Sequence, residues 1–117
     1  MIDFDSADHD MKYMGQEVPH HTRETIEHYL LRGWAPGGFV ESMLANDLER
    51  ALYTADIVNR QRFWTIAMWI REYAPRESWG SYDAIEKWRD DFMGCRSAFA
   101  EKVEKDFVWK QLSRGAQ

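Results

Sequence analysis

The sequence has few of the features that mark secreted or membrane-bound proteins. Cys95 is its only cysteine, so no disulfide can form within one chain, which is typical of proteins in reducing compartments. No apolar run approaches the ~18 residues that a membrane-spanning helix requires. The beginning of the chain, MIDFDSADHD, is acidic and lacks the apolar core of a signal peptide. The sequence therefore predicts a soluble protein of the cytoplasm.

Motifs that would mark common enzyme classes are also missing. Neither GxGxxG nor GxxxxGK[ST] occurs, so the sequence predicts no phosphate-binding loop of these types. Ser42 and Ser81 lie outside the GxSxG motif of serine hydrolases, and Cys95 has no sequence neighbour that would activate a thiol. No pair of carboxylates is marked as an acid and a base. We therefore expect a non-catalytic protein without a cofactor.

The charge excludes a further class of partner. The chain has 20 acidic and 15 Lys and Arg residues, for a net charge of −5, and the two signs are interspersed. No basic stripe stands out, which argues against a nucleic-acid backbone as the main partner. An acidic face that mimics a nucleic acid is a minor alternative.

The composition is that of one globular domain with many aromatic residues. The 117 residues are 44% hydrophobic and 30% charged, a balance found in folded domains. Six Trp, six Phe and five Tyr exceed what a small core usually needs. We therefore expect some aromatic side chains to face a partner or a ligand.

Apolar residues repeat at intervals of three and four, which predicts an all-α fold. We expect a compact bundle of four to six helices with a long C-terminal helix. The helices are expected over 19–32, from about 36 to 44, from 48 to about 52, over 57–74, and from 82 onward. Gly33 and Asn46 are expected at helix ends in the left-handed conformation, and Asp47, Asp56 and Ser81 at helix starts.

The last predicted helix carries a heptad-like apolar seam at Ile85, Trp88, Phe92, Cys95 and Phe99. Gly94 is expected to weaken this helix without breaking it. Whether residues 95–113 form one helix or two stays open.

Three segments are expected along the chain. Residues 1–17 form an acidic N-terminal tail, which is either disordered or docked through its few apolar residues. Residues 18–92 form the helical core domain, and residues 93–117 form a C-terminal helical extension.

Short sequence motifs in the middle of the chain resemble those of a known group of proteins. They are PGGF at 36–39, NDL at 46–48, AD at 55–56 with Asn59, and WGS at 79–81 with Trp88 after it. On the basis of these motifs, residues 26–90 resemble small uncharacterised accessory proteins of tailed bacteriophages. The resemblance implies a phage accessory protein in the cytoplasm of the infected bacterial host. It transfers no catalytic residues.

The stretch GWAPGGF has two interpretations. Gly37 and Gly38 expose backbone N–H groups at a helix start, where an anion would be stabilised, with Trp34 stacking beside it. In the favoured alternative, the two glycines form a tight corner between packed helices and Trp34 closes it. Asn46 and Asp47 pose the same choice between gripping a ligand and simple turn chemistry.

Arginine and tryptophan residues form the main candidate site. Arg60, Trp64 and Arg71 have the spacing of one face of the 57–74 helix, and Arg76 and Trp79 extend from its end. Arg with Trp is a combination used to hold a nucleotide or a protein hot spot. The alternative is that Arg stems cover aromatic residues of the core.

A weaker candidate is a metal site at His21, Glu24 and His28, with His20 adjacent. Imidazole and carboxylate are ligands of divalent transition metals. The two outer histidines are i and i+7, about 10 Å apart along a helix, so a second helix would have to supply ligands. A solvated polar face is the simpler interpretation.

These features support three hypotheses. In the first, a non-catalytic phage accessory protein binds and inhibits a host component such as a bacterial defence protein. In the second, an oligomeric sponge sequesters a nucleotide-like defence signal at the Pro36–Gly38 corner and the Arg–Trp face. The third is a metal-dependent enzyme. The long C-terminal helix also predicts a homo-oligomer.

Overall fold

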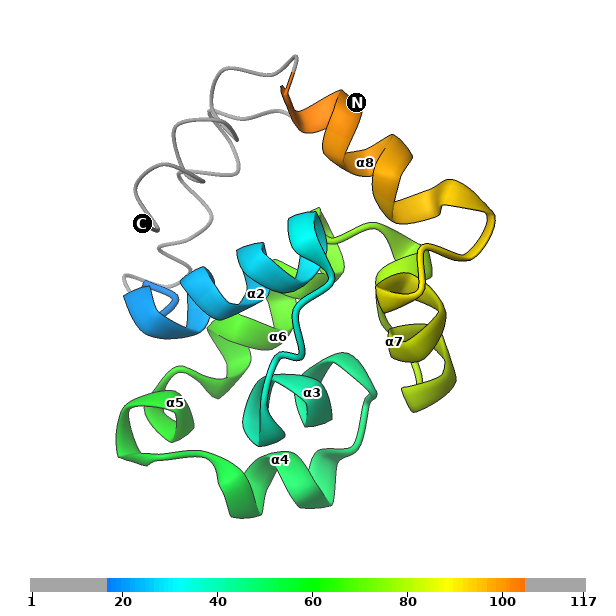
Figure 1. Ribbon diagram of the computed structural model, residues 1–117. Coiled ribbons are helices and arrows are strands. Elements are labelled where there is room, and N and C mark those ends of the chain that lie inside the picture. The colour runs from blue at the N-terminus through cyan, green and yellow to red at the C-terminus, as the bar shows by residue number, and fades with distance from the viewer. Residues whose placement is uncertain (1–16, 105–117) are drawn as a thin grey trace.

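The computed structural model describes residues 17–104, which form a compact helical bundle (Figure 1). No strand occurs within this range, so the predicted all-α fold is confirmed. The α-helices in this range are α2 (His20–Arg32), α3 (Gly38–Leu44), α4 (Leu48–Thr54), α5 (Ile57–Gln61), α6 (Phe63–Tyr73), α7 (Tyr82–Arg89) and α8 (Cys95–Glu104). The short 3₁₀ helices η2 (Arg76–Ser78) and η3 (Phe92–Gly94) precede α7 and α8.

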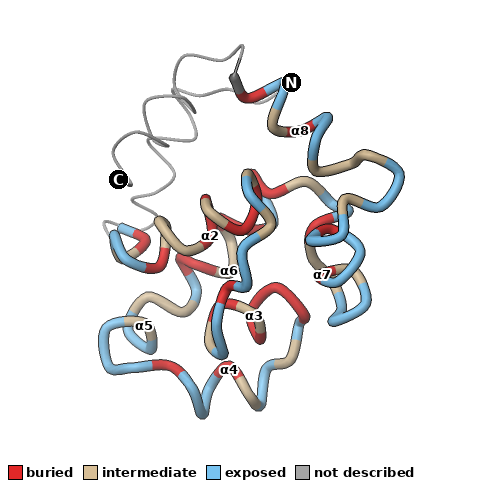
Figure 2. Tube along the Cα trace, viewed as in Figure 1, coloured by how far each residue is buried: buried red, intermediate tan, exposed pale blue. Residues whose placement is uncertain are grey.

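The centre of the core lies where α2, α3 and α6 meet (Figure 2). Ile26 and Leu30 of α2, Leu44 of α3, and Ile66 and Ile70 of α6 are completely buried in one apolar cluster. Burying each such side chain contributes about 1.5–3 kcal/mol of transfer free energy. The 3–4 spacing that predicted the helices therefore also selects their inward faces.

The helix ends follow the sequence signals. Asp47, Asp56 and Ser81 each accept a hydrogen bond from the backbone N–H three residues ahead, at the starts of α4, α5 and α7. Gly33 ends α2 with φ of 71°, and Asn46 follows α3 with φ of 61°. These side chains and left-handed residues satisfy backbone groups that a helix end leaves unpaired.

The helix predicted over 57–74 is divided in two. α5 ends at Gln61 and α6 begins at Phe63, with Arg62 between them at φ −109° and ψ 13°. The backbone N–H of Arg62 is shared between the carbonyls of Val58 and Asn59. No Gly or Pro marks this break, so the sequence pattern did not reveal it.

The continuous seam predicted through Gly94 is also wrong. Asp91, Met93 and Gly94 all have positive φ, so the chain turns between α7 and α8. Asp91 then accepts hydrogen bonds from the backbone N–H and the hydroxyl of Ser97 and so caps α8. As a result, Phe92 is exposed instead of buried in a seam.

α8 returns to the core after this turn and packs on α2 and α7. Phe99 and Val103 are buried, and the Phe99 ring lies 5.9 Å from the Trp88 ring between centroids. Residues 1–16 and 105–117 lie outside the described residues. The predicted acidic N-terminal tail therefore lies almost wholly outside them, and so does the second half of residues 95–113, for which the sequence left one helix or two open. Within residues 17–104, no helix combines the length and apolarity needed to cross a membrane.

Candidate functional site

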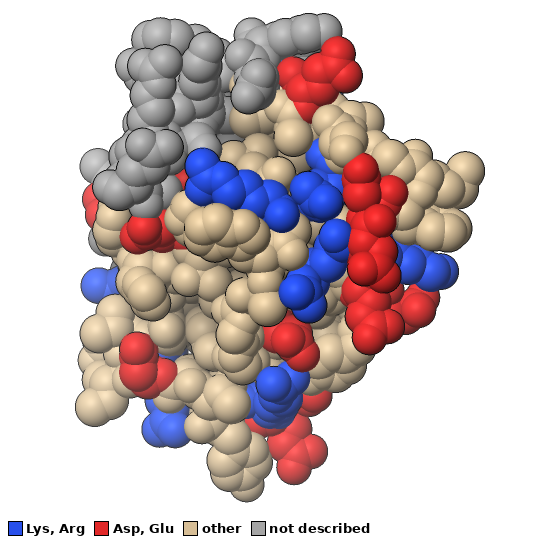
Figure 3. Space-filling model, in the orientation of Figure 1, with Lys and Arg blue, Asp and Glu red and all other residues tan. Residues whose placement is uncertain are grey.

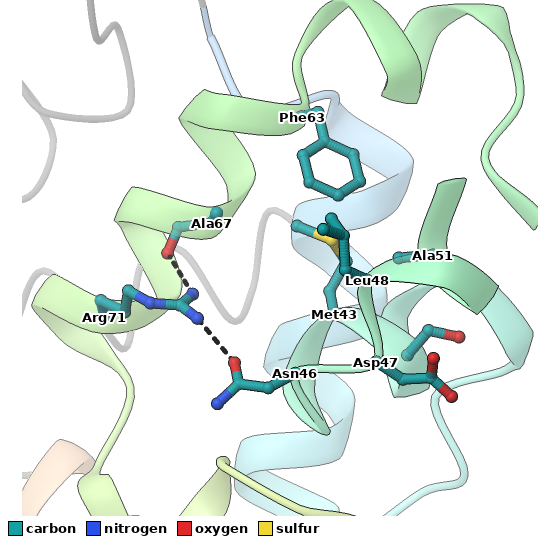
Figure 4. Close-up of a pocket in the computed structure, with 9 residues that line it drawn as sticks. Met43, Asn46, Asp47, Leu48, Ala51, Phe63, Ala67 and Arg71 are labelled. Carbon is teal, nitrogen blue, oxygen red and sulfur yellow. Dashed lines mark hydrogen bonds between the residues drawn. The ribbon is translucent and has the colours of Figure 1, made fainter. Parts of the chain in front are cut away.

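A pocket of about 250 Å³ opens between α3, α4 and α6 (Figure 4). Its apolar walls are the side chains of Met43, Leu48, Ala51, Phe63 and Ala67. Its polar lining consists of Ser42, Asn46, Asp47 and Arg71. The volume lies just below the roughly 300–1,000 Å³ of pockets for drug-sized ligands. The pocket therefore suits a small molecule or a single side chain.

Arg71 of α6 is fixed at this pocket by three contacts. Its Nη1 donates to the Ala67 carbonyl at 3.1 Å, and its Nη2 donates to the Asn46 side-chain oxygen at 2.6 Å (Figure 4). Its guanidinium carbon also lies 5.0 Å from the centroid of the Trp79 ring. The cation is therefore held in one place, which lowers the entropy lost when a ligand binds it.

The other charged side chain of the pocket is directed elsewhere. In Figure 4 the Asp47 carboxylate points away from Arg71. It accepts a 2.6 Å hydrogen bond from the Tyr82 hydroxyl and a 3.2 Å hydrogen bond from the backbone N–H of Arg50. These two bonds, the Tyr82 bond first, lower the pKa of Asp47 below its usual value. Arg71 thus provides the net charge that faces the pocket.

Asn46 and Asp47 combine the two roles that the sequence left as alternatives. Asn46 occupies the left-handed turn position, and Asp47 caps α4, as turn chemistry predicts. Both residues also line the pocket, where Asn46 positions Arg71. The turn that ends α3 is therefore part of the site.

The structure assembles part of the predicted Arg–Trp site. Arg71 and Arg76 both lie over the Trp79 ring, at 5.0 and 4.3 Å from its centroid. Arg76 also donates a 2.6 Å hydrogen bond to the Trp79 carbonyl. Arg60 is on α5 and Trp64 is in the first turn of α6. The prediction that Arg60 shares one helix with Trp64 and Arg71 is wrong, because the break at Arg62 places Arg60 on α5, while Trp64 and Arg71 both lie on α6.

The GWAPGGF stretch is the corner between α2 and α3. Trp34 is 56% exposed and stacks on the ring of His28 at 4.4 Å between centroids. Gly37 has φ of 80° and ψ of 170°, a conformation that L side chains rarely adopt. A Cβ on Gly38 would lie 3.7 Å from the Arg50 guanidinium, so α4 packs close to this turn. None of the three predicted residues, Trp34, Gly37 and Gly38, is among the residues that line the pocket.

The histidine face of α2 does not form the predicted trio. Glu24 lies 3.8 Å from His20 and 3.9 Å from His28, and Arg32 donates to the Nδ1 of His28 at 2.5 Å. Among residues 17–104, no group of three or more His, Cys, Asp or Glu side chains is arranged to hold a metal ion. His21, Glu24 and His28 are therefore not brought together as a metal site.

An exposed apolar surface, of which the sequence predicted only Trp64, adjoins the pocket and shares Leu48 with it. Six large apolar side chains are exposed along α4, α5 and the start of α6: Leu48, Leu52, Tyr53, Ile57, Val58 and Trp64. We call these six residues the α4–α5 surface. Tyr53 is 79% exposed and Ile57 is 73% exposed. The adjacent Ile57 and Val58 gave no local signal of this exposure, because adjacent apolar residues such as Tyr29 and Leu30 of α2 are both buried.

A buried ion pair lies on α2, outside the pocket. Glu27 is 1% exposed, and its Oε1 lies 3.3 Å from the Nε of Arg23. Burial raises the pKa of Glu27 to about 7, although Arg23 acts to lower it and Glu24 raises it further. Proximity to Arg23 therefore does not keep this carboxylate fully ionised at neutral pH.

Comparison of the chain with protein-family models, curated proteins and solved structures found no match.

Proposed function

We propose that this chain is a non-catalytic phage accessory protein that binds and inhibits a component of the bacterial host, in particular a defence protein. The observation that carries the proposal is the α4–α5 surface, where six large apolar side chains face solvent along one stretch of chain. Contiguous exposed apolar patches on soluble domains commonly mark protein interaction sites. The phage and host parts of the proposal come from the resemblance of residues 26–90.

The composition of this surface is that of a protein interface. Tyr53 and Trp64 are aromatic anchors of the kind that dominate binding energy at hot spots. Exposed charged residues of both signs, Glu49, Asp56 and Arg60, lie between the apolar ones, as in the polar rim of an interface. On the face shown in Figure 3, acidic and basic side chains are likewise mixed. This mixture favours a protein partner over a polyanion.

The nucleotide sponge is less well supported. A sponge requires Arg side chains and backbone N–H groups to converge on one pocket. Only Arg71 of the predicted arginines is among the residues that line the pocket, and Gly37 and Gly38 are not. The predicted elements of a phosphate site therefore lie in separate places.

The test is a protection assay in bacteria. Cells carrying a defence system that restricts a phage would express the wild-type chain, the variant Tyr53→Asp/Ile57→Asp, or the control Met93→Asp. Met93 is an exposed apolar residue outside the α4–α5 surface, so its substitution introduces the same kind of change elsewhere. We expect the wild type and the control to restore plaque formation and the double variant to lose this effect at an unchanged melting temperature.

A photo-crosslinking residue at position 53 identifies the partner in the same cells. A host defence protein captured from position 53, and lost with Ile57→Asp, supports the proposal. Capture of a second copy of this chain instead would make the surface a homo-oligomer interface and overturn host binding through it. Protection that survives the double variant would also overturn the assignment of the surface.

A further inference from the structure

We propose that the pocket between α3, α4 and α6 binds a small monocarboxylic acid with an apolar body, such as one aromatic ring or a short branched chain, with Arg71 pairing with the carboxylate. This inference goes beyond the proposed function and does not depend on it. It rests on the shape and charge of the pocket alone.

The walls of the pocket select an apolar body. Met43 and Leu48 lie between Phe63 and the turn after α3, and Ala51 and Ala67 complete the lining (Figure 4). Displacing water from such walls is favourable only for a group that makes no hydrogen bonds there. The two alanines leave the space that the ligand would fill.

The charge of the pocket selects a single negative group. Arg71 lines it as a cation, while the Asp47 carboxylate is turned toward Tyr82 and Arg50. A guanidinium has five N–H donors, and within the described residues Arg71 donates to Ala67 and Asn46. The remaining donors match the two oxygens of a carboxylate.

A doubly charged phosphate fits less well. Arg76, which shares the Trp79 ring with Arg71, donates to the Trp79 carbonyl and is not part of the pocket lining. Arg50 is not part of the lining either, and its guanidinium donates to Glu41 and Tyr82. A volume of about 250 Å³ is also small for a nucleotide. One cation and a small apolar chamber therefore favour a monocarboxylate.

The probe is 3-phenylpropionate, titrated into the full chain and followed by amide chemical shifts in two-dimensional NMR. We expect saturable shifts at residues 42–51 and 63–71, with a Kd on the order of 1 mM or tighter. The uncharged analogue 3-phenylpropan-1-ol should bind at least tenfold more weakly. Equal binding of the two compounds would overturn the role of Arg71.

Two variants and a control locate the site. Arg71→Gln should weaken binding of 3-phenylpropionate at least tenfold, and Ala67→Leu should abolish it by filling the chamber. Arg60→Gln removes the same charge from α5 and should leave the Kd unchanged, as should Tyr53→Asp/Ile57→Asp on the α4–α5 surface. Because Arg71 is exposed, its variant should stay folded, which the melting temperature checks.

Three outcomes would refute the inference. The first is that the wild type shows no saturable shift when the 3-phenylpropionate concentration reaches about ten times the expected Kd. The second is that Arg71→Gln binds the acid as tightly as the wild type does. The third is that the shifts map outside residues 42–71. The double variant separates this result from the proposed function, because it should lose host binding and still bind the acid.

Discussion

The Arg71 guanidinium donates a 2.6 Å hydrogen bond to the side-chain oxygen of Asn46, across 25 residues of sequence. Asn46 has φ of 61°, a left-handed conformation that Asn adopts more readily than most residues. The same residue therefore ends α3 and positions the cation of the pocket. This relationship ties the turn chemistry of one helix to the charge carried by another.

Replacing Asn46 should separate these two roles. Asn46→Ala adds left-handed strain and removes the hydrogen bond to Arg71, so we expect the free energy of unfolding to fall by about 1–2 kcal/mol. Asn46→Gly removes the same bond without the strain and should lower it by less than about 1 kcal/mol. Urea denaturation of both variants measures the difference. If the two variants lose the same free energy of unfolding, the left-handed conformation at position 46 does not affect stability.

The two tryptophans Trp34 and Trp88 should respond differently to truncation. Trp88 is buried and donates a 3.2 Å hydrogen bond to the Leu30 carbonyl, so Trp88→Ala should lower the free energy of unfolding by about 3–5 kcal/mol. Trp34 is exposed and stacked on His28, so Trp34→Ala should lower it by about 0.5–1.5 kcal/mol. Thermal denaturation followed by circular dichroism compares them. If Trp34→Ala unfolds the protein, the Trp34 side chain belongs to the core, and its exposed placement is contradicted.

Glu27 should make the protein less stable as the pH rises. Its pKa is raised from 4.5 to about 7 in the folded chain, so between these values the folded state binds a proton that the unfolded state has released. The free energy of unfolding therefore falls by about 2–3 kcal/mol between pH 4.5 and 7 through this group and levels off once the pH has passed the folded-state pKa.

Glu27→Gln keeps the shape of the side chain and removes its titration. We expect this variant to be more stable than the wild type at pH 8 and close to it at pH 4. Denaturation midpoints measured from pH 4 to pH 8 give the slope of stability against pH for the wild type and for Glu27→Gln. If both proteins show the same slope between pH 4.5 and 7, Glu27 does not carry the effect.

Tyr82 should hold the Asp47 carboxylate in its ionised form. Hydrogen bonds from Tyr82 and Arg50 lower the pKa of Asp47 below 3.8, so its contribution to stability is present above pH 3.8 and is lost as the pH falls through the lowered value. Tyr82→Phe should return this pKa toward 3.8, as an NMR titration of the Asp47 carboxyl group would show. The stability difference between wild type and Asp47→Asn should shrink toward pH 2. A pKa unaffected by Tyr82→Phe would contradict the arrangement.

Much of the fold follows from local signals in the sequence. Asp47, Asp56 and Ser81 start helices, and Gly33 and Asn46 end them, because each satisfies backbone groups within a few residues. The spacing of apolar residues identified the buried faces of α2 and α6 for the same reason, since helical periodicity is local.

The candidate site was less visible, because its parts come together through breaks that no local residue announces. Arg62 separates Ile57 and Val58 of α5 from the apolar repeat of α6. The turn at 91–94 depends on Asp91 reaching Ser97, a bond that forms only once the chain has turned. Arg60 was therefore placed with Arg71, and the exposed pair Ile57 and Val58 was assigned to the core helix.

The sequence by itself determined the class of fold, most helix boundaries and the identity of Arg71 and Trp79 as residues of interest. These depend on interactions between near neighbours, which residue type and spacing encode directly. Only the tertiary structure decided that Arg71 meets Asn46, that Ala51 and Ala67 leave a chamber between three helices, and that Tyr53 and Ile57 face solvent. Which side chains meet or remain exposed depends on how the helices pack, and packing is set by the whole core at once.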